Sequence, residues 1–345
     1  MRVLYAVFHP LPVSESYIRN EIEWLEKQGI EIGIWARHER LAVGYPDSGR
    51  RYWIGEPATI GRAIDEFKPM VVHAHPLFIG QMVADDVERK GLPLTIRGHV
   101  GFTGREPENV FMIRSFLSRN VVSKLWTFPH ICRDIDHYKA ASLPASYFSP
   151  AFVPGVPDLK RFVLRIGTAL PAKGWEEFVK IAERCPAIKF VAALAIPNKK
   201  YAEILIASGP KNLTFYKDLQ RNDCVKLMQA SWIYLRGHDP GPGPACHRYG
   251  MPISIAEALG CGVPVIARDA PEAREYIGPS GIYYRNVVQA VLAVTDAMIW
   301  PEEKQKEISD QAVEQARLYR DDVNYPQVLS YWRQLARWRY ACLGT

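Results

Sequence analysis

Short apolar runs rich in β-branched residues alternate along this chain with longer stretches of helical periodicity. The run Val3–Phe8 is followed by Ser16–Gln28, in which apolar residues recur every three or four positions, and then by the run Ile30–Trp35. Such alternation is typical of βαβ units and predicts parallel sheets with helices on both faces. The sequence therefore predicts an α/β fold.

A proline-rich segment interrupts this alternation once. Residues 142–160 contain proline at a density that is incompatible with a helix interior or a central strand, and strands and helices resume at Phe162. The chain has 345 residues, and globular domains usually contain about 100–200 residues. We therefore predict two domains, 1–150 and 160–325, joined by a linker at about 142–160.

The composition excludes several classes of protein. Hydrophobic residues make up 48% of the chain and charged residues 23%, which is typical of globular proteins. A net charge of +6 leaves no large basic surface of the kind that binds nucleic acid. The six cysteines are scattered without a CxxC pair, which favours a reducing compartment. Because the first apolar run is too short for a signal peptide or a membrane span, we expect a cytoplasmic protein.

The segment from Tyr249 to Ala267 contains the clearest candidate site. A turn with Gly250 leads into a predicted helix, with Pro252 near its first turn, and a strand follows. The free N–H groups and the dipole of a helix N-terminus favour phosphate groups, and glycine lets them approach closely. The predicted diphosphate-binding residues are Gly250, Met251, Pro252, Ile253 and Ser254.

Glu257 lies three residues after Ser254, on nearly the same face of this helix. Its carboxylate can accept hydrogen bonds from both hydroxyls of a ribose whose phosphates rest on the helix start. The alternative is an exposed helix glutamate without a ligand, and periodicity alone does not separate the two.

The string SIAEALGCGVPVIA, residues 254–267, resembles the hallmark segment of retaining glycosyltransferase family 4. Residues 14–29 resemble the first helix of that family, and Val72–His75 resembles a strand-end motif. The family has the GT-B fold, in which two Rossmann-like, doubly wound parallel-sheet domains face each other across a cleft. The resemblance implies that the first domain lies on the acceptor side and the second binds the donor. It also implies a terminal helix, at about 326–345, that crosses back onto the first domain.

Residues Ile166–Gly174 resemble the glycine-rich strand-to-helix turn of the family. The resemblance implies that Gly167, Thr168 and Lys173 border the donor diphosphate. A cation at the place of Lys173 would stabilise the charge that develops on the leaving group, whereas a solvated surface lysine is the alternative. The family usually has an arginine at the place of Thr168, so one cation that faces the phosphates is absent.

Two further departures concern the sugar half of the site. The family usually has a glutamate at the place of Tyr249 and a histidine at the place of Arg97. Either Arg97 replaces that histidine or His99 supplies the imidazole, so both are predicted catalytic candidates together with Lys173. Because a guanidinium forks onto phosphate oxygens, Arg97 could also supply the charge that is lost at position 168.

The other candidates are expected to line the cleft. Those bordering the donor sugar are His75, His238, Arg248 and Tyr249, and those on the acceptor side are Ser14 and Glu15. Strand alternation is expected to point one of His73 and His75 inward and the other outward. His238, Cys246 and His247 could ligate zinc, but adjacent cysteine and histidine seldom close a tetrahedron together, and we predict no metal site.

The resemblance implies transfer of a hexosyl group with retention, from a nucleoside-diphosphate sugar to a hydroxyl acceptor, without a cofactor. We expect a UDP-sugar rather than a GDP- or ADP-sugar, and a glycan, lipid-linked or small-molecule acceptor, as in polysaccharide or glycolipid biosynthesis. Basic amphipathic stretches around Arg114 and Arg333 could touch the inner face of a membrane. The alternative makes them a sheet-covering helix and the terminal helix.

Two other functions compete with this prediction. If the departures at Thr168 and Tyr249 mark lost chemistry, the chain is a non-catalytic nucleotide-sugar or glycan-binding protein. A nucleotide-sugar epimerase would need carboxylates near the sugar ring, and Tyr249 does not supply one. The base, the sugar and the acceptor depend on loops whose geometry cannot be read from the sequence.

Overall fold

The computed structural model of the chain describes residues 1–9, 16–39, 49–98, 107–155, 161–196, 198–237 and 252–343. The chain divides into two compact units. The first contains Met1–Ala145 and Asp321–Thr345, and the second contains Ser146–His247 and Met251–Arg320. The last helix thus belongs to the unit in which the chain begins.

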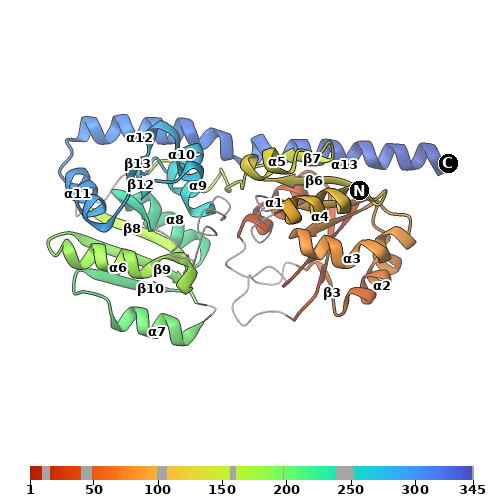
Figure 1. The fold of residues 1–345 in the computed structure, drawn as a ribbon, viewed down its shortest axis with the longest axis horizontal. Helices are drawn as coiled ribbons and strands as arrows, with labels where there is room; N and C mark the ends of the chain where they lie inside the picture. Colours follow the sequence, from red (N-terminus) through yellow and green to blue (C-terminus); the bar gives the residue numbers. More distant parts are fainter. Residues whose placement is uncertain are drawn as a thin grey trace. The chain divides into compact units, whose positions relative to one another are not determined.

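The first unit is built on a parallel sheet, whose described strands lie in the order β3-β2-β1-β4-β5-β6-β7 (Figure 1). These strands are β1 (Arg2–Val7), β2 (Glu31–Ala36), β3 (Arg51–Ile54), β4 (Val71–His75), β5 (Leu94–Arg97), β6 (Val122–Thr127) and β7 (Ala140–Ser142). The helices are α1 (Ser16–Lys27), α2 (Ile60–Phe67), α3 (Leu77–Arg89), α4 (Pro107–Leu117), α5 (Pro129–Ile135) and α13 (Asp321–Leu343). The strand order reverses between β1 and β4, and doubly wound sheets bind ligands outside the carboxyl ends of the strands at such a point.

The core of the first unit lies between its sheet and the helices α1 and α13. Strand β1 is buried over almost its whole length, as expected for a central parallel strand. Helix α1 contributes Ile18, Ile22 and Leu25 to this core, at the spacing of one helix face. Trp332 of α13 is fully buried in the same cluster. Helix α13 therefore completes the first unit.

The second unit has the same topology, with described strands in the order β10-β9-β8-β11-β12-β13. Its strands are β8 (Phe162–Thr168), β9 (Lys189–Ala195), β10 (Leu213–Lys217), β11 (Ile233–Arg236), β12 (Val265–Arg268) and β13 (Ile282–Tyr284). The helices are α6 (Trp175–Arg184), α7 (Lys199–Ala207), α8 (Arg221–Ala230), α9 (Ile253–Gly260), α10 (Pro271–Ile277), α11 (Val287–Met298) and α12 (Glu302–Ala316). The order reverses between β8 and β11.

Connections between parallel strands are right-handed. The helices that follow strands on one side of the reversal therefore cover one face of the sheet, and those on the other side cover the opposite face. Helix α6 accordingly packs with α11 on one face, and α9 packs with α8 and α12 on the other. The predicted α/β class with two parallel-sheet domains is confirmed. None of the helices in the described ranges combines the length and the apolar character that a membrane span requires.

Candidate functional site

The carboxyl ends of β8 and β11 meet at the reversal point of the second unit. Strand β8 ends with Gly167 and Thr168, both half-buried, and β11 ends with Arg236. Helix α9 begins close by, because Tyr234 of β11 contacts Ser254 in the first turn of that helix. The structure thus brings the predicted residues Gly167, Thr168 and Ser254 to one edge of the sheet.

The turn that carries Lys173 follows β8 and is held by two buried side chains. Arg165, fully buried within β8, donates from Nη1 to the carbonyl of Gly174 at 2.8 Å and from Nη2 to the carbonyl of Lys173. Its guanidinium lies 4.3 Å from the ring centre of Trp175. Trp175 in turn donates Nε1–H to the carbonyl of Thr168 at 2.8 Å. These contacts fix the backbone of Lys173, while its side chain is half-exposed.

The N-terminus of helix α9 lies at the same edge. Pro252 precedes the helix and Ile253 is its first residue. The hydroxyl oxygen of Tyr234 lies 3.0 Å from the carbonyl of Ile166 and 2.7 Å from Ser254 Oγ. A phenol has one proton, so when Tyr234 donates to Ile166, Ser254 donates to Tyr234. The hydroxyl proton of Ser254 is then bonded to Tyr234 and is not available to a ligand. A phosphate at this helix start would instead accept hydrogen bonds from backbone N–H groups.

Glu257 lies one turn further along α9 and is only 8% exposed, so it is not a surface glutamate. Within the described residues its carboxylate makes no hydrogen bond or ion pair. Burial raises the pKa of this carboxyl to about 7, although the positive charge of Arg221 opposes the shift. Buried polar groups are normally hydrogen-bonded, so this carboxyl group is well suited to accept bonds from the hydroxyls of a ligand.

Several predicted site residues lie outside the described residues. They are Ser14, Glu15, His99, His238, Cys246, His247, Arg248, Tyr249, Gly250 and Met251. Their roles at the acceptor, the donor sugar and the helix start stay predictions.

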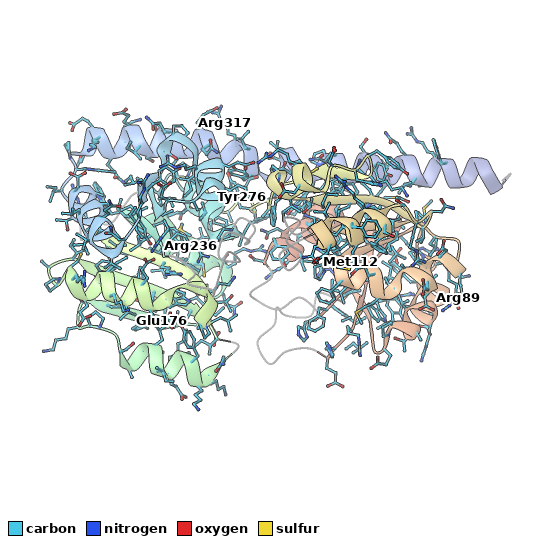
Figure 2. The ribbon with its side chains drawn as sticks, viewed as in Figure 1. Arg89, Met112, Glu176, Arg236, Tyr276 and Arg317 are labelled. Carbon is cyan, nitrogen blue, oxygen red and sulfur yellow. The ribbon has the colours of Figure 1, made fainter. Side chains whose placement is uncertain are left out.

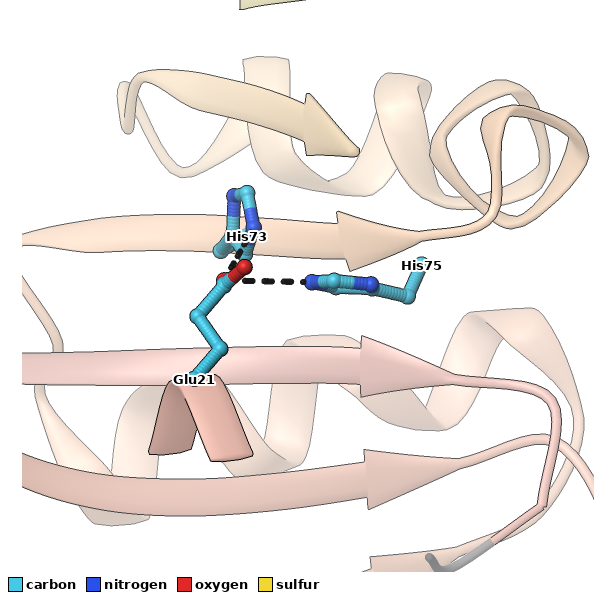
Figure 3. A group of neighbouring side chains, drawn as sticks. All are labelled: Glu21, His73 and His75. Carbon is cyan, nitrogen blue, oxygen red and sulfur yellow. Dashed lines mark ion pairs between the residues drawn. The ribbon is translucent and has the colours of Figure 1, made fainter. Parts of the chain in front are cut away.

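The first unit contains a buried polar cluster next to the carboxyl ends of its central strands. Nε2 of His73 lies 3.2 Å and Nε2 of His75 lies 3.4 Å from Oε1 of Glu21 (Figure 3). Tyr5 donates its hydroxyl proton to the same oxygen at 2.8 Å. Both histidines face Glu21, so the expectation that they point in opposite directions is wrong. Residues two positions apart in a strand project from the same face.

Thr95 and Trp332 contact the histidine side of this cluster. Trp332 donates Nε1–H to Thr95 Oγ1 at 3.1 Å, and this oxygen lies 2.9 Å from Nδ1 of His73. When Thr95 donates to Nδ1, the Nε2–H of His73 faces Glu21. Burial lowers the pKa of His73, and it lowers that of His75 to about 4, so both are neutral at pH 7. Burial opposes ionisation of Glu21, yet the hydrogen bond from His73 and the interaction with His75 hold its pKa well below the usual value.

Arg97 at the end of β5 belongs to this cluster and is 2% exposed. It donates from Nη2 to the carbonyl of Pro144 at 2.6 Å. Burial lowers the pKa of Arg97, whereas attraction to Glu21 raises it. The carboxylate and imidazole atoms of Glu21, His73 and His75 lie within 4.8 Å of one another and are of the type that binds zinc. A divalent cation there would lie close to the buried guanidinium, so the charge of the cluster disfavours a metal.

Arg97 is therefore anchored to the carbonyl of Pro144, near Glu21, and its contact with a phosphate stays a prediction. Arg165, Tyr234 and Arg236 were not predicted as site residues. The position of Tyr234 and Arg236 at the end of a buried strand that precedes the candidate helix is the one sequence signal that points to them.

Comparison with known proteins shows a family that the second unit resembles. Residues 151–317 match the family described as Glycosyl transferases group 1. No curated protein matches the sequence of this chain.

Solved structures resemble the whole chain. Sucrose-phosphate synthase from Thermosynechococcus elongatus has a TM-score of 0.75 and 12% identity, over 97% of this chain and 99% of that chain. Anabaena Alr3699/HepE in complex with UDP-glucose has a TM-score of 0.76 and 14% identity, over 97% and 100%. An α,α-trehalose-phosphate synthase (UDP-forming) from Burkholderia vietnamiensis has a TM-score of 0.68 and 11% identity, over 96% of each chain.

These likenesses establish the GT-B fold, because they extend over nearly the full length of each pair. The family match covers the unit that holds Lys173 and Glu257. The second unit is therefore similar to the glycosyl transferases group 1 family, and the chain is a glycosyltransferase.

Proposed function

We propose that this chain transfers a sugar from a nucleoside-diphosphate sugar to a hydroxyl group of an acceptor, with retention of the anomeric configuration as in glycosyltransferase family 4. One observation carries the proposal: Glu257 is a buried carboxyl group, without a partner among the described residues, one helical turn from the start of α9. A diphosphate at a helix start and a ribose diol one turn away are two parts of the same nucleotide.

In the proposed reaction the bond between the anomeric carbon and the diphosphate oxygen breaks, and its electron pair leaves with the diphosphate. The acceptor oxygen forms a bond to the same face of that carbon, and the acceptor proton passes to the leaving diphosphate. Lys173 stabilises the developing negative charge, and the contacts from Arg165 and Trp175 hold its turn in place beforehand. We assign no metal and no cofactor to this reaction.

The donor we propose is a UDP-sugar. Similar structures support this choice, since Anabaena Alr3699/HepE was solved with UDP and with UDP-glucose and the trehalose-phosphate synthase is UDP-forming. We propose a glycan, lipid-linked or small-molecule acceptor, and action in the cytoplasm or at the inner face of the membrane.

A thermal-shift screen with UDP-, GDP- and ADP-sugars tests the nucleotide. A ligand that binds only the folded state raises the melting temperature by mass action, so we expect a shift with UDP-sugars. No shift with any of the three would contradict the proposal. The Glu257→Gln variant should lose most of the shift, whereas Glu303→Gln, at an exposed position of α12, should keep it.

Product analysis then separates the competing functions. A transferase releases UDP when donor and acceptor are mixed. A non-catalytic binding protein shows the thermal shift without releasing UDP. An epimerase converts the donor into an isomeric UDP-sugar without any acceptor.

A further inference from the structure

We propose that Arg236 binds the diphosphate of the donor and supplies the positive charge that Thr168, in the place of an arginine, lacks. This inference rests on the nucleoside-diphosphate function proposed above. It concerns a residue that belongs to no sequence motif and that only the arrangement of neighbouring strands brings to the site.

The direction of Arg236 follows from its strand. Arg236, which is labelled in Figure 2, is the last residue of β11. It is half-exposed, and the three residues before it are buried. Tyr234, two positions earlier, projects from the face that α9 covers, because it contacts Ser254. Side chains two apart in a strand share a face. Arg236 therefore projects toward the α9 side, one step nearer the carboxyl edge.

Thr168 projects from the same face. Tyr234 pairs with Leu164 in the parallel ladder between β11 and β8, and alternation from Leu164 puts Thr168 on the side of Tyr234. Thr168 and Arg236 thus end neighbouring strands on one face, next to the start of α9. A long arginine side chain on β11 can reach phosphate oxygens that an arginine at position 168 would contact.

The other guanidinium groups at this edge already have partners. Arg165 donates to two main-chain carbonyls and lies beneath Trp175. Arg268, at the end of the next strand, pairs with Glu177 at 2.9 Å. Within the described ranges the side chain of Arg236 makes no hydrogen bond or ion pair. All of its side-chain donors are therefore available for an anion.

The local charge also favours an anion. Burial and, next, the charge of Arg236 lower the pKa of Arg165 to about 10, which reflects two like charges close together. The nearby carboxylate, Glu177, is engaged by Arg268 and by the hydroxyl of Tyr284. A diphosphate at this edge would relieve the repulsion between the two guanidinium groups.

The main chain around Arg236 is well supported. The hydroxyl group of Tyr284, which donates to Glu177, lies against the carbonyl of Arg236, with its oxygen 3.2 Å away. Gly237 follows, and a Cβ atom there would lie 2.4 Å from Nη1 of Arg165 and 2.8 Å from the carbonyl of Gly174. The end of β11 therefore packs directly against the turn that carries Lys173, which places Arg236 and Lys173 on adjoining segments of one edge.

Binding of UDP and uridine to four proteins tests the inference: the full-length wild type, Arg236→Gln, Arg236→Lys and the control Arg268→Gln. Calorimetry measures UDP and ligand-observed NMR measures uridine. We expect Arg236→Gln to bind UDP about 10- to 100-fold more weakly, the usual effect of losing a hydrogen bond to a charged group, with uridine affinity unchanged. Arg236→Lys should retain part of the affinity, and Arg268→Gln should bind both ligands as the wild type does.

Three results would overturn the inference. Wild-type UDP affinity in Arg236→Gln would show that Arg236 does not touch the diphosphate. An equal loss for UDP and uridine, with an unchanged melting temperature, would assign Arg236 to the nucleoside. If the wild type binds none of UDP, GDP or ADP, the proposed function fails and the inference fails with it. If the wild type binds UDP and Arg236→Gln binds it equally well, only the inference fails.

Discussion

The hydroxyl oxygen of Tyr234 lies 2.7 Å from Oγ of Ser254, which ties the end of β11 to the first turn of α9. The same oxygen lies 3.0 Å from the carbonyl of Ile166 in β8. One phenol therefore joins two central strands and the helix whose start is proposed to hold the diphosphate. A site supported by such contacts between regular elements is more rigid than one built on loops alone.

Replacing Tyr234 with phenylalanine removes both contacts and leaves two buried polar groups without this partner. We expect the free energy of unfolding to fall by about 1–3 kcal/mol and UDP to bind more weakly. Urea denaturation and calorimetry measure the two effects. Tyr201→Phe is the matched control, because its hydroxyl bonds to Glu176 at an exposed site, and its effect should stay within about 0.5 kcal/mol. Equal losses in the two variants would contradict the role of Tyr234.

Glu257 should make stability depend on pH. Its pKa is about 7 in the folded protein, above the value of about 4.3 for an unfolded chain. The folded state therefore binds more protons between these values, so stability falls as the pH rises from about 4.3 to about 7 and levels off above that. We expect Glu257→Gln to exceed the wild type by up to about 3 kcal/mol at pH 8.5 and to match it near pH 4. Denaturant unfolding at both pH values checks this, and a variant that is less stable at pH 8.5 would refute it.

Lys173 should act in turnover and not in folding. Removing a preorganised cation from a leaving group typically lowers kcat by about 100- to 1000-fold, and we expect a loss of this order in Lys173→Ala, with the melting temperature unchanged. Release of UDP in the presence of acceptor is the measurement. Lys180→Ala, at an exposed position of α6, is the control. If Lys173→Ala turns over as fast as the wild type, Lys173 is a solvated surface lysine without a role in the reaction.

Arg97 and Glu21 should be coupled in stability. Arg97→Met removes the bond from the guanidinium to the carbonyl of Pro144 and the positive charge near Glu21, and losing a hydrogen bond from a charged group costs about 1.5–3 kcal/mol. The double variant with Glu21→Gln should lose less than the sum of the two single variants. A double-mutant cycle from denaturant unfolding measures the coupling, and additive effects would argue against it. A loss of UDP affinity in folded Arg97→Met protein would support the predicted phosphate contact.

Periodicity predicts the long elements of this fold well. The helical stretch Ser16–Gln28 is α1, and the apolar runs Val3–Phe8 and Ile30–Trp35 coincide with β1 and β2 to within two residues at each end. Strand β3 and helix α2 are absent from the prediction. Strand β3 has four residues, none of them buried, so it lacks the apolar run by which strands are recognised.

The site was only partly predictable for a different physical reason. Glu257 and Lys173 stand in local motifs, so the sequence points to them. Arg165 and Arg236 are isolated cations within strands. Their roles depend on which strands lie next to them and on which face of the sheet α6 and α9 cover. Those relationships are set by tertiary packing and leave no local pattern.

Helix α13 has a consequence for how the protein is made. Trp332 donates to Thr95, which lies 237 residues earlier, and it fills the core beneath β1 and α1. During synthesis the first unit leaves the ribosome before the second, but it is complete only when α13 has been made. Residues 146–320 are all synthesised while an apolar face of the first sheet still awaits its covering helix. The first unit therefore exposes an apolar face during synthesis for longer than the second, and exposed apolar surface of this kind promotes aggregation.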